Sequence, residues 1–289
     1  MSPKWWRKWV PGKPNFKLRA PLVLLATVIS LLFSQPASGT SGIKIDARPG
    51  VSSTHFKHIT IAINNITRFF SDNYKLALQK KMRIIIVPDD QTFAKVLVSD
   101  FGYAPAVAHK EAPILGGKAL DAKGEYLLVI KAKASHAMPW IIEVACHEIV
   151  HWYQYQVAGS KKTGEVKWLA EGCATVIAYQ IVGTVTDKTM DQYHREKLNT
   201  LRKAAAIPTL RELYSRRDWA AAMDKYGGGA VYSKATAAVL ELGQRQGVNS
   251  LFYYFINLQK VPPAQAFEQA FGLNMHQFEN DMDQKLGKS

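Results

Sequence analysis

The sequence has few cysteines, no internal repeats and no low-complexity segment. Only Cys146 and Cys173 occur among 289 residues, which excludes a small domain held together by a framework of disulfides. Because 47% of the residues are hydrophobic, the chain can bury a full core. We therefore expect one large domain or two closely packed lobes.

Acidic residues are absent from the first 39 positions, which contain six lysines and arginines. The whole chain has 37 basic and 23 acidic residues, so the remainder keeps 31 basic residues against 23 acidic ones. These basic residues are scattered singly or in pairs such as Lys161 with Lys162. Such spacing is typical of a solvated surface and not of a phosphate-binding stripe, so we expect no nucleic-acid partner.

The N-terminal segment has the three parts of a secretory signal. A basic stretch with three tryptophans precedes an apolar run at residues 20–33, and the small residues Ala37 and Gly39 follow. The run is shorter than the roughly 20 residues that a membrane-spanning helix needs. We interpret residues 1–39 as a signal peptide of an exported protein, whether secreted, periplasmic or in the cell envelope. The alternative is an uncleaved anchor, which would be the protein's membrane contact.

The mature chain divides into two parts. Residues 40–138 mix patterns: residues 56–72 have helical apolar spacing, residues 82–87 form a β-branched run, and two strand-like segments at 115–120 and 125–131 flank a turn. Residues 139–289 have helical spacing almost throughout. The sequence predicts an α+β fold, with a small mixed sheet followed by a mainly helical lobe and the active-site helix at the junction.

Polar residues in the helix predicted from Pro139 need an explanation, because that helix is apolar around most of its circumference. Glu143, His147 and His151 are spaced four residues apart and therefore share one stripe of it. Two histidines one turn apart can bind one metal ion. Glu148, one residue round from His147, can act on a water bound to that ion.

A third ligand must come from elsewhere, since a catalytic zinc usually has three protein ligands. Glu171 is the one charged side chain between Trp168 and Val182, in a second apolar helix, where a carboxylate needs a cation. Gly172 would let the two helices approach closely. We predict one catalytic zinc ion held by His147, His151 and Glu171. The alternative, core histidines hydrogen-bonded to Glu143 and Glu171, poorly explains four titratable groups in two apolar helices.

These residues resemble the gluzincin metallopeptidases, the group of thermolysin and aminopeptidase N, and more closely the bacterial peptidase MA-like domains. The H-E-x-x-H pattern at residues 147–151 is followed by W-L-x-E-G-x-A at residues 168–174, and residues 264–286 are similar to the terminal helices of the MA-like domains. The resemblance implies a zincin-like fold and zinc-dependent hydrolysis of peptide bonds, with Glu148 as general base. It departs at Thr175, where thermolysin-like enzymes have an aspartate that orients a histidine.

Further features of the site come from the resemblance and from the strand pattern. Tyr226, followed by three glycines, resembles the tyrosine that stabilises the oxyanion in the aminopeptidase branch, and Tyr232 is the alternative donor. The strand at residues 115–120 is expected to be the edge with which an extended peptide pairs. Gly116 and Gly117 would let the substrate backbone come close.

The two cysteines flank the predicted ligands. If the two helices cross at the metal, Cys146 and Cys173 could form a disulfide, and the alternative is a pair of buried thiols.

Three functions remain open from the residues alone: a zinc peptidase acting on a peptide or protein, a catalytically inactive gluzincin-fold module that binds a partner or serves a structural role outside the cell, and an amide hydrolase for a non-protein substrate. The intact Glu148 argues against the inactive module, because a residue that is not a ligand can be lost without destabilising the fold.

We predict that the mature exported protein lacks residues 1–39, because the segment has the order and length of a cleaved signal. N-terminal sequencing of exported material tests this. A mature chain that still begins at Met1 and sediments with the membrane would establish the anchor instead.

Overall fold

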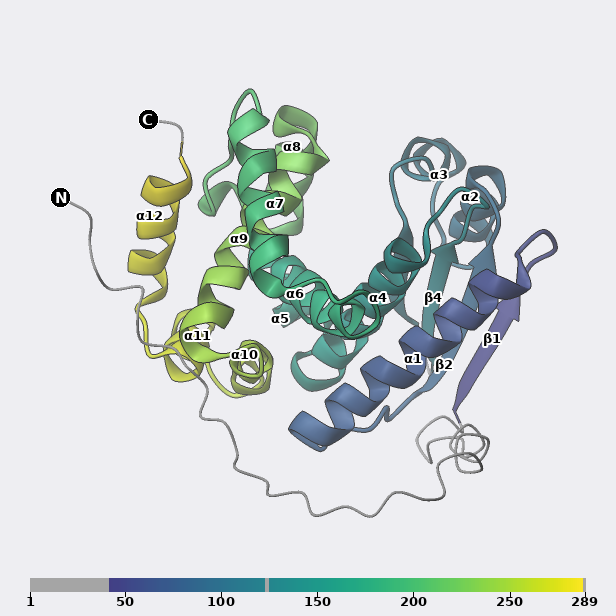
Figure 1. The fold of residues 1–289 in the computed structure, drawn as a ribbon, viewed down its shortest axis with the longest axis horizontal. Coiled ribbons are helices and arrows are strands. Elements are labelled where there is room, and N and C mark those ends of the chain that lie inside the picture. Colours follow the sequence, from purple (N-terminus) through teal and green to yellow (C-terminus); the bar gives the residue numbers. More distant parts are fainter. Residues whose placement is uncertain (1–41, 123–124, 288–289) are drawn as a thin grey trace, which may run out of the picture. The chain divides into compact units, whose positions relative to one another are not determined.

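The structure, a computed structural model, describes residues 42–122 and 125–287 (Figure 1). The expected signal peptide lies outside the described residues. In this part of the chain, a four-stranded sheet precedes a long helical region. The predicted α+β fold, with the small sheet first and the helices after it, is confirmed.

The sheet is mixed. Its strands are β1 (Ile43–Ala47), β2 (Lys81–Val87), β3 (Gly117–Ala122) and β4 (Glu125–Lys131), in the order β1-β2-β4-β3. The first three in this order run parallel, whereas β3 is antiparallel to β4 and forms one edge. The hairpin was predicted from sequence, although β3 begins two residues later than the strand-like segment did.

Both faces of the sheet are covered, which explains why its central strands are apolar without alternation. Ile84 and Ile86 of β2 join one core with α1 (Ser53–Tyr74) and α4 (Met138–Ala158). Ile85 and Val87 point the other way, into a smaller core with α2 (Asp90–Ser99) and α3 (Pro105–Glu111).

Helix α4 lies where the sheet meets the helical region, as the sequence predicts. Pro139 stands in its first turn, where a missing N–H is harmless, and the helix ends at Gly159, whose φ of 78° leaves the helical region. It packs against α1 and β3 on one side and against α6 on the other.

The helical region continues from α4 to the end of the described chain (Figure 1). Its elements are α5 (Ser160–Thr163), α6 (Lys167–Thr186), α7 (Met190–Lys203), a 3-10 turn (Arg211–Leu213), α8 (Arg216–Tyr226), α9 (Gly228–Gln246), α10 (Ser250–Leu258), α11 (Pro263–Phe271) and α12 (Met275–Leu286). Helix α6 is long and apolar enough to cross a membrane, but most of it is buried inside the protein.

Gly172 has a different role from the one expected. A Cβ atom on this residue would lie 2.5 Å from a methyl group of Val239 and 2.7 Å from the carbonyl oxygen of Ala235. Both residues belong to α9. The glycine therefore lets α6 approach α9, and not α4 as the sequence suggested.

We predict that Gly172→Ala destabilises the protein by about 1–3 kcal/mol, because backbone and packed side chains of α9 must move to admit the methyl group. Gly229→Ala is the matched control, since its Cβ would meet nothing closer than 3.9 Å and alanine favours helix by up to about 1 kcal/mol. Urea unfolding of both variants measures the difference. Equal midpoints for the two would contradict the close α6–α9 approach.

Candidate metal centre

His147 and His151 of α4 and Glu171 of α6 converge on one point. The two Nε2 atoms are 3.1 Å apart. One oxygen of Glu171 lies 3.1 Å from Nε2 of His147, and the other lies 3.4 Å from Nε2 of His151. The three side chains are 14%, 6% and 6% exposed, respectively. The structure thus brings together the three ligands predicted from sequence, in a group that could hold a metal ion.

Gln154 sets the tautomer of His151. Its amide nitrogen donates to the carbonyl of Ala170, at 3.0 Å, so its amide oxygen faces Nδ1 of His151, at 2.8 Å. Because that oxygen can only accept, Nδ1 carries the proton. Nε2 of His151 therefore keeps its lone pair.

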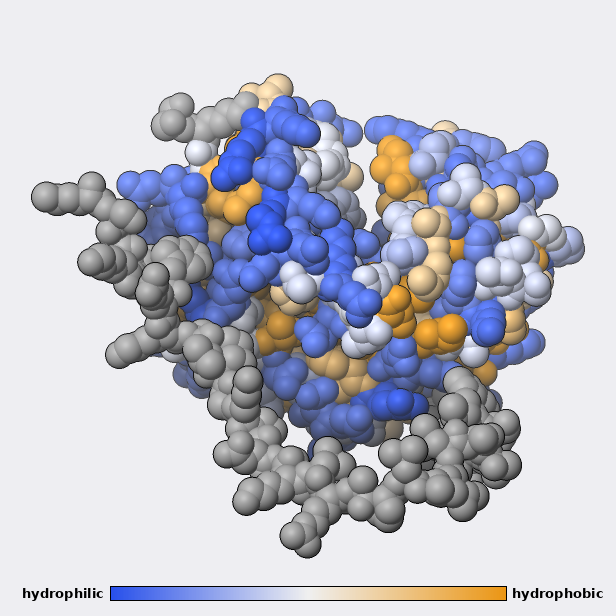
Figure 2. All heavy atoms as spheres, in the orientation of Figure 1, coloured by the Kyte–Doolittle hydropathy of each residue, from blue (hydrophilic) through white to orange (hydrophobic). Residues whose placement is uncertain are grey.

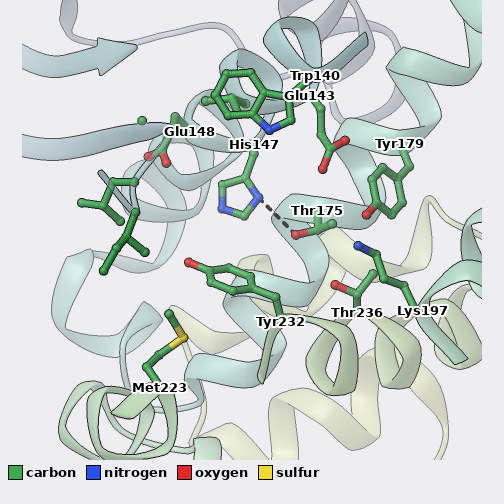
Figure 3. A pocket seen from close by; sticks show the side chains of 15 residues that line it. Trp140, Glu143, His147, Glu148, Thr175, Tyr179, Lys197, Met223, Tyr232 and Thr236 are labelled. Carbon is green, nitrogen blue, oxygen red and sulfur yellow. Dashed lines mark hydrogen bonds between the residues drawn. The ribbon is translucent and has the colours of Figure 1, made fainter. Parts of the chain in front are cut away.

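Thr175 does the same for His147 (Figure 3). Its hydroxyl donates to the carbonyl of Glu171, at 3.0 Å, which leaves the oxygen to accept from Nδ1 of His147, at 3.2 Å. Nε2 of His147 then also keeps its lone pair. Thr175 thus occupies the position where the sequence departs from the thermolysin-like pattern, and it still orients a histidine there.

The result is a cluster of acceptors without a matching set of donors. Two nitrogen lone pairs and two carboxylate oxygens face one another in a buried space, where they repel unless a cation or a proton lies between them. Two imidazoles and one carboxylate are ligands that zinc accepts, and the outer contacts to Gln154 and Thr175 are those that ligating histidines usually make. Glu143, by contrast, makes no hydrogen bond to either histidine among the described residues, so only the Glu171 half of the hydrogen-bonded alternative is present.

Lys167 supplies the nearest positive charge. Its ammonium forms an ion pair with Glu171, one turn along α6. Burial raises the pKa of the Glu171 carboxyl, but the charges of Lys167 and His151 outweigh this and hold the pKa well below its usual range. Burial lowers the pKa of His147, whereas the Glu171 carboxylate, which can accept a hydrogen bond from Nε2 once the ring is protonated, raises it, and the net shift is upward. Glu171 is thus ionised at neutral pH, with Lys167 competing for it against any metal ion.

A pocket of about 250 Å³ opens beside the cluster. His147, Glu148 and Thr175 line it, together with residues of β3, α7, α8 and α9. In the space-filling view, the surface is hollowed between the region of α8 and the region of α3 (Figure 2). Glu148 thus faces a space that a substrate can enter, and it stands outside the ligand cluster, as its predicted role requires.

The glycine pair at the start of β3 has a packing role that the sequence did not suggest. A Cβ on Gly117 would lie 2.8 Å from Cγ of Glu148, and one on Gly116 would lie 2.9 Å from the ring of Trp140. The glycines therefore let the end of β3 come close to α4. They also line the pocket, and β3 forms an edge of the sheet as predicted.

Tyr226 is not among the residues that line the pocket, so the structure does not support the catalytic role predicted for it. It is the last residue of α8, and its hydroxyl donates to Glu212 at 2.7 Å. Tyr232, in the next helix, lines the pocket with His147 (Figure 3). Burial, and then the charges of Glu171 and Glu148, raise the pKa of Tyr232 well above its usual value, so it remains a proton donor.

The disulfide hypothesis is also wrong. Both cysteines are buried free thiols. Although α4 and α6 are neighbours, the thiol of Cys146 lies 3.7 Å from the carbonyl oxygen of Ala62 in α1, and that of Cys173 lies 3.9 Å from the carbonyl oxygen of Leu251 in α10. The two sulfurs therefore point to different neighbours.

No protein-family model matches the chain, and no curated protein is significantly similar to it. The resemblance to gluzincins accordingly rests on the sequence motifs alone.

We predict opposite effects on zinc affinity from two neighbouring changes in α6. Glu171→Ala should weaken binding by roughly 10²-fold or more, because one of three ligands is lost. Lys167→Met should strengthen binding on the order of tenfold, because the competing charge leaves the carboxylate. Titration against a chromophoric chelator measures both.

Lys161→Met is the control for Lys167→Met, since it removes an exposed lysine of α5. A zinc affinity unchanged by Glu171→Ala would show that the cluster is not the binding site. An affinity lowered by Lys167→Met would show that the lysine supports the site instead of competing for it.

Proposed function

We propose that the protein is a zinc-dependent peptidase. The observation that carries the proposal is the convergence of two imidazoles, each with its Nε2 lone pair set by a neighbouring side chain, and the Glu171 carboxylate, beside a pocket into which Glu148 faces. His147, His151 and Glu171 would hold the ion. A zinc ion bound there would polarise the scissile carbonyl and lower the pKa of the attacking water.

Glu148 is placed to handle the proton. It lines the pocket directly after the ligand His147, where its carboxylate can take the proton from the attacking water and pass it to the leaving nitrogen. Because Gly117 has no side chain, it leaves room for the side chain of Glu148. The protein's own contribution is thus a base held beside the ligands without being one of them.

Tyr232 is the residue that we assign to the developing oxyanion, in place of Tyr226. Its hydroxyl stays protonated because the site is buried and negatively charged, and a donor aimed at developing charge stabilises the transition state. The outer edge of β3, next to the pocket, offers backbone groups with which an extended substrate can pair. A peptide fits these features better than a compact amide does.

A second candidate is the catalytically inactive binding module. It is favoured by the ion pair of Lys167 with Glu171, which neutralises the carboxylate without a metal. The position of Glu148 in the pocket favours the enzyme, since an inactive module does not require a carboxylate there.

We predict that Glu148→Gln keeps near-stoichiometric zinc while peptide turnover falls by roughly 10² to 10⁴, the scale of losing a general base. Tyr232→Phe should lower turnover by roughly 10² to 10³, as for an oxyanion donor, with zinc unchanged. Tyr226→Phe is the matched control and should stay near the parent, because its hydroxyl bonds to Glu212 outside the pocket. Metal analysis and hydrolysis of a mixed peptide library give the readouts.

Two outcomes would count against this mechanism. If the zinc-loaded parent cleaves no peptide in the library, the binding module or a non-peptide amide hydrolase takes the place of the peptidase. If Tyr226→Phe is the variant that loses turnover, the proposed assignment to Tyr232 is wrong.

A further inference from the structure

The pocket has two chemically different ends, one on each side of His147 (Figure 3). Met223 and Glu148 lie on one side (Figure 3), and the apolar residues Ile114, which is 66% exposed, and Leu115 also line the pocket. The polar end is formed by side chains from α4, α6, α7 and α9, namely Glu143, Tyr179, Lys197 and Thr236. A ligand that lies across His147 therefore meets Met223 and the Glu148 carboxylate on one side and the opposite charges of Glu143 and Lys197 on the other.

Glu143 and Lys197 are half-buried and oppositely charged, and they attract each other across the polar end without direct contact. Among the described residues, neither side chain makes a hydrogen bond or a salt bridge, and the Lys197 ammonium lies over the ring of Tyr179, 5.6 Å from its centre. Burial raises the pKa of the Glu143 carboxyl and lowers that of the Lys197 ammonium. Since half-buried polar groups without hydrogen bonds are costly, both gain from a ligand that bonds to them.

The opposite charges restrict what that ligand can be. A lysine or arginine side chain would pair with Glu143 but approach Lys197, and an acidic side chain would meet the reverse problem. A neutral group that both donates and accepts satisfies both residues without adding charge. The carboxamide of glutamine or asparagine has an N–H₂ for Glu143 and a carbonyl oxygen for Lys197.

The position along α4 indicates where such a side chain belongs in the substrate. Glu143 precedes His147 by four residues, which is about 6 Å along the helix axis. This is of the order of the reach from a scissile bond to a side chain on a residue next to it. The polar end is thus within range of a residue that flanks the cleaved bond.

We propose that Glu143 and Lys197 form a specificity subsite for a carboxamide side chain, glutamine or asparagine, on a residue flanking the scissile bond. The proposal rests on the peptidase function for the identity of its ligand. Its physical basis is a pair of opposite charges from α4 and α7, neither of them hydrogen-bonded, that line one pocket beside the candidate metal centre.

The test varies one residue of a cleaved peptide, blocked at both ends, among glutamine, glutamate, lysine and leucine, at each position flanking the cleaved bond. The parent should prefer glutamine at one of these positions on the order of 10²-fold in kcat/KM, because mispaired charges and unpaired polar groups penalise the others. Glu143→Gln should move the preference to glutamate, and Lys197→Met should move it to lysine. Glu268→Gln and Lys203→Met, which change exposed charges on α11 and α7, should keep the preference of the parent.

Binding without turnover separates this proposal from the peptidase function. N-acetyl amides of the same four amino acids are titrated by NMR into Glu148→Gln, alone and combined with each subsite variant. Selective binding of the glutamine amide, with the same switches, supports the subsite even if no peptide is cleaved. Cleavage with an identical side-chain preference in all variants overturns the subsite and leaves the peptidase intact. A preference for peptides with a free amino terminus, whatever their side chains, also overturns it, because Glu143 would then bind the terminus.

Discussion

The contact between α4 and α6 is the constraint on which the rest of the site depends. Both helices are apolar on nearly all sides, so they are buried together, and the few polar groups they carry must find partners within that contact. Gln154 of α4 donates a hydrogen bond to the carbonyl of Ala170 in α6. In return, Thr175 of α6 is hydrogen-bonded to His147 of α4. These two bonds hold both imidazoles in one tautomer, which turns the two Nε2 lone pairs toward the Glu171 carboxylate in an arrangement that could hold a metal ion.

The other side of α6 determines what surrounds the candidate centre. Because Gly172 has no side chain, α9 packs closely against α6, and Tyr232 of α9 reaches the pocket. The glycines of β3 play the corresponding part next to α4. The pocket is therefore built by close approaches of neighbouring elements, at positions where a methyl group would not fit.

Much of the candidate centre could be predicted from sequence, because its main features are local. Residues four apart on one helix share a face whatever the tertiary structure. This spacing indicates that His147 and His151 form a candidate ligand pair. A lone carboxylate in an apolar helix needs a cation, which identifies Glu171. The edge position of β3 followed from a hairpin signal. Lys167 was not predicted, although its position one helical turn before Glu171 could have indicated the ion pair.

The features that could not be predicted depend on the orientation of each helix about its own axis relative to its neighbours. Tyr226 and Tyr232 are six residues apart, but the helix break at Gly227, where φ is 77°, turns the first tyrosine away and leaves the second in the pocket. Cys146 and Cys173 lie on neighbouring helices and still face α1 and α10. No pattern within a single helix fixes the direction in which that helix presents a given side chain to its neighbours.

The three candidate ligands lie within a short stretch of chain. Bringing them together therefore needs shorter-range contacts than building the rest of the site does. His147 and Glu171 are 24 positions apart, in a pair of consecutive long helices, so bringing them together closes a small loop at little entropic cost. The far wall of the pocket comes from α7, α8 and α9, and its near edge comes from β3. The candidate ligand set is thus the part of the site with the shortest-range contacts, whereas the walls of the pocket bring together residues from Ile114 to Thr236.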